Sequence, residues 1–92
     1  MDWNLCLHQA PQLEINEATD GVLVYQRDRD RLHLLNPTAA LLLESCDGTL
    51  RADELPELVA TAFGMDEQPV DDVATCLMTL LREGLLVAAV DP

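Results

Sequence analysis

The sequence contains no lysine. Its strongly basic side chains are five arginines, which stand against seventeen Asp and Glu residues and leave a formal net charge of −12. Phosphate backbones are bound mainly through cationic contacts, and anionic membranes repel a negative surface. The charge therefore argues against a nucleic-acid or membrane partner. It favours the attraction of cationic partners, most strongly at low salt.

Aromatic residues, long apolar runs and cysteine motifs are also scarce. One Trp, one Tyr and one Phe leave the core to Leu, Val and Ala. No apolar run approaches the ~18 residues that a membrane-spanning helix needs. The cysteines Cys6, Cys46 and Cys76 lack C-x-x-C spacing, which argues against a disulfide framework or a zinc site. We expect reduced thiols, no metal and a cytoplasmic protein.

The apolar residues that are present suffice for one folded domain. Hydrophobic residues make up 49% of the 92 residues, which is too many for a disordered chain, and the length suits a single domain. Residues 1–10 show no clear hydrophobic period. We therefore divide the chain into a flexible N-terminal arm, residues 1–10, and a folded domain, residues 11–92.

Three strands are predicted at the start of this domain. Residues 11–15 alternate apolar and polar side chains, and residues 22–26 are β-branched and aromatic. The turn cluster "NEATDG" joins them, and the charged tip "RDRD" leads into a return strand over residues 31–35. Short connections between consecutive strands predict a three-stranded antiparallel meander.

A strand-to-helix corner follows in "HLLNPTAALLLESCDG". Asn36 fits an N-cap, because its side-chain oxygen can accept a hydrogen bond from the first turn, and Pro37 fits the first helical position. The helix is predicted through about Cys46. It is apolar on most sides, which is typical of a buried helix. Asp47-Gly48 ends it, since Gly48 can adopt the left-handed conformation.

Two further helices and a short strand are predicted after this point. The helices cover residues 52–63 and 70–83 and end at glycines, and residues 85–90 form the strand. Their apolar stripes have helical spacing and are expected to face the core. These stripes are Leu55, Leu58, Val59, Ala62 and Phe63, then Val73, Leu77, Leu80 and Leu81. Strands followed by helices predict an α+β fold with a winged helix-turn-helix outline.

No residue pattern predicts catalysis. His8 and His33 are the two histidines, and His33 has no Cys or Ser in a usable local motif, so we expect it to be structural. Asp71 and Asp72 diverge by about 100° on a helix and cannot share a proton. They fit the first helical turn, where the dipole favours negative charge. No phosphate-binding loop occurs. We expect neither enzyme activity nor a cofactor.

The remaining candidate is a binding surface along residues 31–35. If this strand is the edge of the sheet, its free N–H and C=O groups can pair with a strand of another chain. The third helix offers an adjoining wall, with Asp71, Ala74, Met78 and Arg82 on one flank. Met78 either grips a peptide as an adaptable apolar contact or fills a gap beside the sheet.

The order of these motifs resembles the PqqD family. The resemblance rests on "HLLNPTAALLLESCDG", "DELPELVATAFG" and "VDDVATCLMTLLREGLL", with "PQL" as the opening. It spans about residues 11–87. Its motif positions are Leu35-Asn36, Ala39-Ala40, Asp47-Gly48, Leu55 to Phe63, Asp72-Val73 and Gly84-Leu85. The excess of acidic residues and the long N-terminal arm depart from the family's pattern.

The resemblance implies a non-catalytic peptide chaperone, or RiPP recognition element. Such a protein binds the leader of a ribosomally synthesised, post-translationally modified precursor peptide by strand addition. It presents the precursor to a modifying enzyme, often a radical SAM protein, or to a leader peptidase. Carried onto this chain, the leader-binding residues are Arg31, Leu32, His33, Leu34, Leu35, Asp71, Ala74, Thr75, Met78 and Arg82.

Two other classes of function stay open at this point. A winged-helix regulator that binds DNA is compatible with the outline, although the second helix has no arginine and the third has only Arg82. The second open class is a structural subunit or a fragment of a fused enzyme. Retention on heparin at moderate salt would favour the regulator, and co-purification with a partner would favour the subunit.

Overall fold

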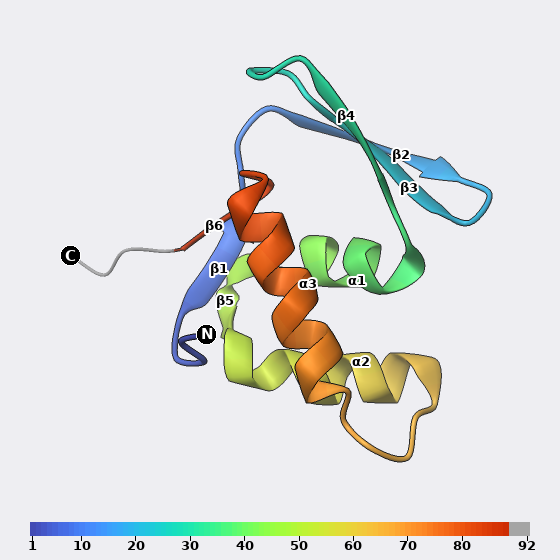
Figure 1. Ribbon diagram of the computed structural model, residues 1–92, viewed down its shortest axis with the longest axis vertical. Helices are drawn as coiled ribbons and strands as arrows, with labels where there is room; N and C mark the ends of the chain where they lie inside the picture. Colours follow the sequence, from blue (N-terminus) through green and yellow to red (C-terminus); the bar gives the residue numbers. More distant parts are fainter. Residues whose placement is uncertain (89–92) are drawn as a thin grey trace.

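The computed structural model describes residues 1–88, which form an α+β fold as predicted. Within these 88 residues, six strands form two antiparallel sheets in the orders β5-β1-β6 and β2-β3-β4, and three α-helices accompany them. Figure 1 shows the β2-β3-β4 sheet at one end of the molecule and α3 lying across α1 and α2. The bounds are β1 Cys6–Gln9, β2 Leu13–Ala18, β3 Gly21–Gln26, β4 Arg31–Leu35, α1 Pro37–Ser45, β5 Asp47–Arg51, α2 Leu55–Phe63, α3 Val70–Arg82 and β6 Leu86–Ala88.

The meander of β2, β3 and β4 confirms the three predicted strands and their order. β4 has the predicted bounds, whereas β2 continues to Ala18 and reduces the expected six-residue turn to Thr19 and Asp20. The polar run Asn16–Glu17 was predicted as a turn. It is exposed on an edge strand, where polar side chains are tolerated because solvent covers them.

Helix α1 begins at the predicted corner after β4. Asn36 Oδ1 accepts a hydrogen bond from the Ala39 N–H at 2.8 Å, and Pro37 occupies the first turn. Losing such a cap costs roughly 1 kcal/mol. The helix buries Ala39, Ala40, Leu42 and Leu43, as expected for a helix that is apolar on most sides.

The β5-β1-β6 sheet corrects two expectations. Residues 6–9, which were expected to lie in a flexible arm, form β1 in the middle of this sheet, and Leu7 is 1% exposed. Asp47-Gly48 does not simply stop α1: Cys46 is the C-cap, and Gly48, with φ +89°, already belongs to β5. β1, with the sequence CLHQ, and β5, with the sequence DGTLR, lack the alternation of apolar and polar side chains that predicts a strand, so the pattern along the chain did not indicate them.

Helices α2 and α3 agree with the predicted ranges, except that residues 52–54 form a separate 3₁₀ turn before α2. Gly64 caps α2 in the left-handed conformation, with φ +64°. The α3 stripe is buried as predicted at Val73, Leu77 and Leu80. The α2 stripe is only partly buried, because other elements cover one side of the helix and leave Phe63 46% exposed.

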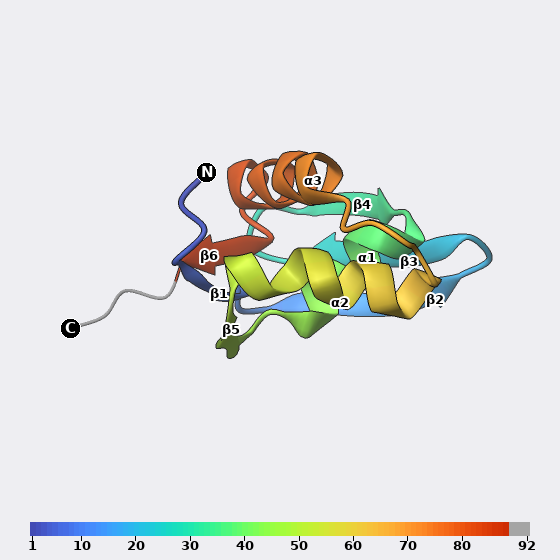
Figure 2. The ribbon, with the colours of Figure 1, turned by 90° about the horizontal axis from the view of Figure 1, so that it is seen from below.

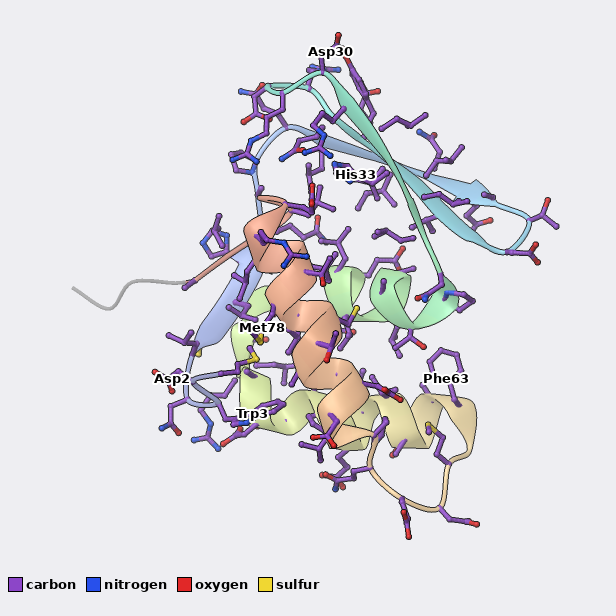
Figure 3. The ribbon with its side chains drawn as sticks, viewed as in Figure 1. Asp2, Trp3, Asp30, His33, Phe63 and Met78 are labelled. Carbon is purple, nitrogen blue, oxygen red and sulfur yellow. The ribbon has the colours of Figure 1, made fainter. Side chains whose placement is uncertain are left out.

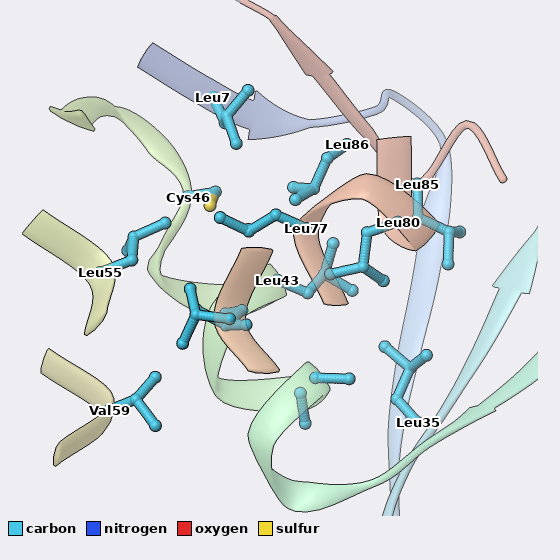
Figure 4. Close-up of a cluster of buried hydrophobic side chains, with 14 of the residues drawn as sticks. Leu7, Leu35, Leu43, Cys46, Leu55, Val59, Leu77, Leu80, Leu85 and Leu86 are labelled. Carbon is cyan, nitrogen blue, oxygen red and sulfur yellow. The ribbon is translucent and has the colours of Figure 1, made fainter. Parts of the chain in front are cut away.

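The core gathers side chains from both sheets and all three helices. Figure 4 shows Leu7 and Leu86 facing Leu77 of α3, with Leu43 of α1 below them. Leu35, the last residue of β4, packs against the same cluster. β6 covers the first part of the predicted final strand, and residues 89–90 lie outside the described residues. Within residues 1–88, no helix combines the length and apolar character needed to cross a membrane.

Candidate functional site

Strand β4 forms one edge of the β2-β3-β4 sheet. It pairs with β3 on one side, and within residues 1–88 no strand pairs with its other side. Figure 1 shows β4 along the margin of the sheet, running down to the start of α1. The predicted edge strand is therefore an edge in the fold, with unpaired backbone groups along it.

The turn between β2 and β3 determines which backbone groups face that edge. Two residues separate Ala18 from Gly21, and in a hairpin of this length the flanking pair exchanges both of its ladder hydrogen bonds. Such pairs alternate with unbonded pairs along a strand. In β3, the N–H and C=O groups of Gly21 and of every second residue after it thus point at β2. Those of Val22 and of every second residue after it point at β4.

The β4 residues opposite this second set are Leu35, His33 and Arg31. A close contact agrees with this assignment, because a Cβ built on Gly21 would lie 1.8 Å from the carbonyl oxygen of Leu35. That carbonyl therefore points at β3. Leu32 and Leu34 alternate with these residues, so their N–H and C=O groups point out of the sheet at the free edge.

The side chains of Leu32 and Leu34 are exposed as well. They lie on the face of the sheet that points away from the core, opposite Tyr25 and Leu23, and are 65% and 70% exposed. Adjacent Leu35 is only 9% exposed. Single exposed leucines are common, but two along an unpaired strand edge combine apolar side chains with free backbone groups. An added strand could pair with these backbone groups and cover these apolar side chains, which solvent does less favourably.

A buried glutamine links β4 to the end of α3. The Gln26 side chain is 1% exposed, and its Nε2 donates to the carbonyl oxygens of Glu83 and Gly84 at 3.1 and 3.3 Å. Because both amide hydrogens are used, Gln26 Oε1 is left to accept from His33 Nε2 at 3.1 Å. His33 thus carries a proton on Nε2 and holds the middle of β4 in place. This contact supports the structural role expected for it.

The first residue of β4, Arg31, also contacts the C-terminal end of α3. Arg31 forms an ion pair with Glu83 at 2.9 Å, and Arg29 Nη1 donates to the Glu83 carbonyl oxygen at 3.2 Å. The Arg31 side chain is 54% exposed, so the pair contributes at most about 1 kcal/mol. Its main effect is geometric, because it places the start of β4 beside the end of α3.

The predicted α3 half of the site lies on the outward face of that helix. Ala74 is half-buried, and the other four residues are exposed; these are Asp71, Thr75, Met78 and Arg82. Figure 3 shows Met78 on the side of α3 nearer the N-terminal segment, well apart from His33. The structure thus joins β4 to the C-terminal end of α3, and the role of these five helix residues stays a prediction.

Two open hollows lie elsewhere, the larger between α1 and α2 and the smaller between α1, the β2-β3 hairpin and Phe63 at the end of α2. Their volumes are about 480 and 400 Å³, and Leu41 lines both. No residue of β4 or α3 lines either one. The sequence reading missed this region because it assigned Leu58, Ala62 and Phe63 to the core. Surplus apolar residues on α2 were the signal that could have indicated it.

Two of the three cysteines, Cys46 and Cys76, are not activated thiols. Burial raises the pKa of the Cys46 thiol to about 11, and burial also raises the pKa of Cys76. Both side chains are therefore neutral thiols at neutral pH, which are poor nucleophiles and poor metal ligands. Among residues 1–88, no three His, Cys, Asp or Glu side chains are grouped so that they could hold a metal ion.

Comparison with known proteins agrees with the resemblance seen in the motifs. A family model described as "Coenzyme PQQ synthesis protein D (PqqD)" matches residues 21–86. These residues run from the start of β3 to the first residue of β6, so they include the β4 edge and all three helices. No curated protein and no solved structure matches the chain. Since the family model covers well over half of the 92 residues, the chain belongs to the PqqD family.

Proposed function

We propose that this protein binds the leader of a ribosomally synthesised, post-translationally modified precursor peptide by strand addition along β4. It acts in the cytoplasm, without catalysis, and presents the precursor to a modifying enzyme such as a radical SAM protein, or to a leader peptidase. Membership of the PqqD family supports a precursor-binding role in the biosynthesis of modified peptides. Strand addition and the identity of the enzyme go beyond that membership.

The observation that carries this proposal is the outward register of Leu32 and Leu34. Each directs one N–H and one C=O at the free edge, so an extended peptide can form up to four main-chain hydrogen bonds with them. Main-chain pairing gives affinity to an extended segment irrespective of its sequence. The anchoring of His33 through Gln26 holds the strand in place before the peptide arrives.

Selection among peptides then depends on the alternating side chains of the bound strand. One set lies on the outer face beside Leu32 and Leu34 and is expected to be apolar. The other set points to the inner side, where the exposed residues of α3 form the proposed wall. The wall residues are Asp71, Ala74, Thr75, Met78 and Arg82.

Replacing Leu34 by proline tests the proposal, with Leu34→Ala as the matched control. Proline removes the outward N–H, whereas alanine keeps it and removes only the larger side chain. The β3 ladder is spared in both variants, because the Leu34 N–H does not point at β3. In titrations with leader peptides encoded by neighbouring short reading frames, we expect Leu34→Pro to lose about tenfold or more in affinity. Leu34→Ala is expected to lose less.

NMR spectra of the labelled full chain locate the binding in the same experiment. Shifts confined to residues 31–35 and α3 are the expected result. Equal affinity of Leu34→Pro and the parent protein, with the fold intact, would contradict strand addition along β4. Shifts gathered elsewhere on the protein would contradict the site.

A further inference from the structure

Two hollows share Leu41 of α1, and we call them together the α1–α2 groove. The larger lies between α1 and α2, and the smaller lies between α1, the β2-β3 hairpin and Phe63 at the end of α2. Leu41 of α1 lines both hollows, with Leu58 and Ala62 of α2 in the larger and Phe63 in the smaller. Figure 2 shows α1 and α2 side by side, with α3 on one side of this layer. In Figure 3, Phe63 stands at the end of α2 and points toward the sheet of β2 and β3. The groove is therefore separate from the β4 edge.

The floor of the groove consists of apolar residues that stay accessible to solvent, including Leu41, which also packs against the core. Leu41 and Leu58 are half-buried, Ala62 is exposed and Phe63 is 46% exposed. Phe63 is one of only three aromatic residues in the chain. Large apolar side chains that converge in an open groove are typical of surfaces that bind another protein.

The rim of the groove is acidic. Glu17 and Glu44 line the smaller hollow, Glu54 and Glu57 line the larger, and no arginine lines either. The three ion pairs found within residues 1–88 use other carboxylates. Glu54 Oε2 does accept a hydrogen bond from the Arg51 N–H at 2.8 Å. An apolar floor between carboxylates that form no ion pair within residues 1–88 complements a segment that is apolar along one stripe and cationic on its flanks.

We propose that the α1–α2 groove binds a basic amphipathic helix of a partner protein. The apolar stripe of that helix lies over Leu41, Leu58 and Phe63, and its Lys or Arg side chains reach the rim carboxylates. A second copy of this chain does not fit, because each copy carries a net charge of −12 and no lysine. This inference does not depend on the proposed leader site, since the two surfaces share no lining residue.

A synthetic helical peptide tests the groove directly. The probe has about 15 residues, with leucines at helical spacing flanked by arginines, and the control peptide carries glutamate in place of each arginine. On titration into the labelled full chain, we expect the basic peptide to shift the amide signals of Leu41, Leu58 and Phe63. We expect the acidic peptide to shift none of them. Binding should weaken about tenfold in Glu44→Arg/Glu57→Arg.

A matched pair of variants distinguishes binding in the groove from nonspecific binding to exposed apolar side chains. Phe63 and Met65 are 46% and 44% exposed and lie two residues apart, but only Phe63 lines the groove. We expect Phe63→Ser to lose binding and Met65→Ser to keep it. Absence of binding, equal binding of the two peptides, equal loss in both serine variants, or shifts at residues 31–35 instead would each overturn the proposal. Self-association of the chain that the basic peptide displaces would also overturn it.

Discussion

The two sheets of this molecule are built in opposite ways. β2, β3 and β4 follow one another along the chain and are joined by short turns, whereas β1, β5 and β6 come from the beginning, the middle and the end. The meander needs only local contacts. The β5-β1-β6 sheet forms only after distant segments meet, so its assembly costs more loop-closure entropy and depends on the helices between those segments.

The sheets also differ in what they bury. Leu7 of β1 and Leu86 of β6 are 1% exposed, while Leu32 and Leu34 of β4 are 65% and 70% exposed. The sheet of distant segments therefore contributes to the core that holds the helices together. The meander shares that core through Val22, Val24 and Leu35 but leaves an apolar, unpaired edge along β4. Stability is thus expected to respond to mutations at buried positions of either sheet, and peptide binding to mutations along the exposed β4 edge.

The sharpest test of this division is Leu7→Asp. A buried, unpaired carboxylate in the middle of the β5-β1-β6 sheet should destabilise the fold by more than about 4 kcal/mol, because the charge loses its hydration. Denaturant unfolding measures the effect, and we expect little folded protein to remain. Leu34→Asp places the same charge on the exposed edge and should change stability by no more than about 0.5 kcal/mol. Similar losses in both variants would remove the distinction between the sheets.

Gly21→Ala gives the next largest expected effect and lies in the meander. A methyl group there would lie 1.8 Å from the Leu35 carbonyl oxygen, so β3 and β4 must separate where they meet. We expect a loss of about 3 kcal/mol in the free energy of unfolding. Gly48→Ala in β5 is the control, since Gly48 also has positive φ but no atom lies within 4 Å of its added Cβ. It should lose about 1 kcal/mol from backbone strain alone.

Alkaline pH provides the mildest test, through Cys46, the C-cap of α1. Burial raises the pKa of this thiol from 9.0 to about 11 in the folded state. Its contribution to stability is thus fully present below pH 9 and is lost as the pH rises towards 11, because the unfolded thiol ionises first. The slope is at most about 1.4 kcal/mol per pH unit. Unfolding curves of Cys46→Ala should show a shallower decline over this range; an unchanged decline would exclude Cys46 as its cause.

The strand that carries the proposed site could be predicted because its signals are local. The charged tip before Arg31 and the cap at Asn36 lie within a few residues of β4, and consecutive strands pair through short turns. The outward direction of the Leu34 backbone could not be predicted. It depends on the two-residue turn at Thr19 and Asp20. The polar residues Asn16 and Glu17 were predicted to belong to that turn, although they lie in β2.

The helices show the same limit on their exposed sides. Val73, Leu77 and Leu80 of the α3 stripe are buried as predicted and Leu81 is half-buried, whereas Phe63 of the α2 stripe lines the α1–α2 groove. Helical spacing shows that apolar residues share a face. The neighbouring helices determine how much of that face is covered. Only the packed structure therefore shows which of these residues are buried in the core and which line a groove.

The amino-acid sequence by itself determined the acidic charge, the β2-β3-β4 meander, the capped start of α1 and the positions of three helices. These follow from side-chain charge, turn residues and caps, which act within a few residues of one another. Only the tertiary structure decided that residues 6–9 pair with β5 and β6, that Leu32 and Leu34 face a free edge, and that α1 and α2 leave a groove. The first and the third depend on segments distant in sequence meeting in space, and local preferences carry no information about that meeting. The second depends on the exact length of the β2-β3 turn, which fixes the register of the meander.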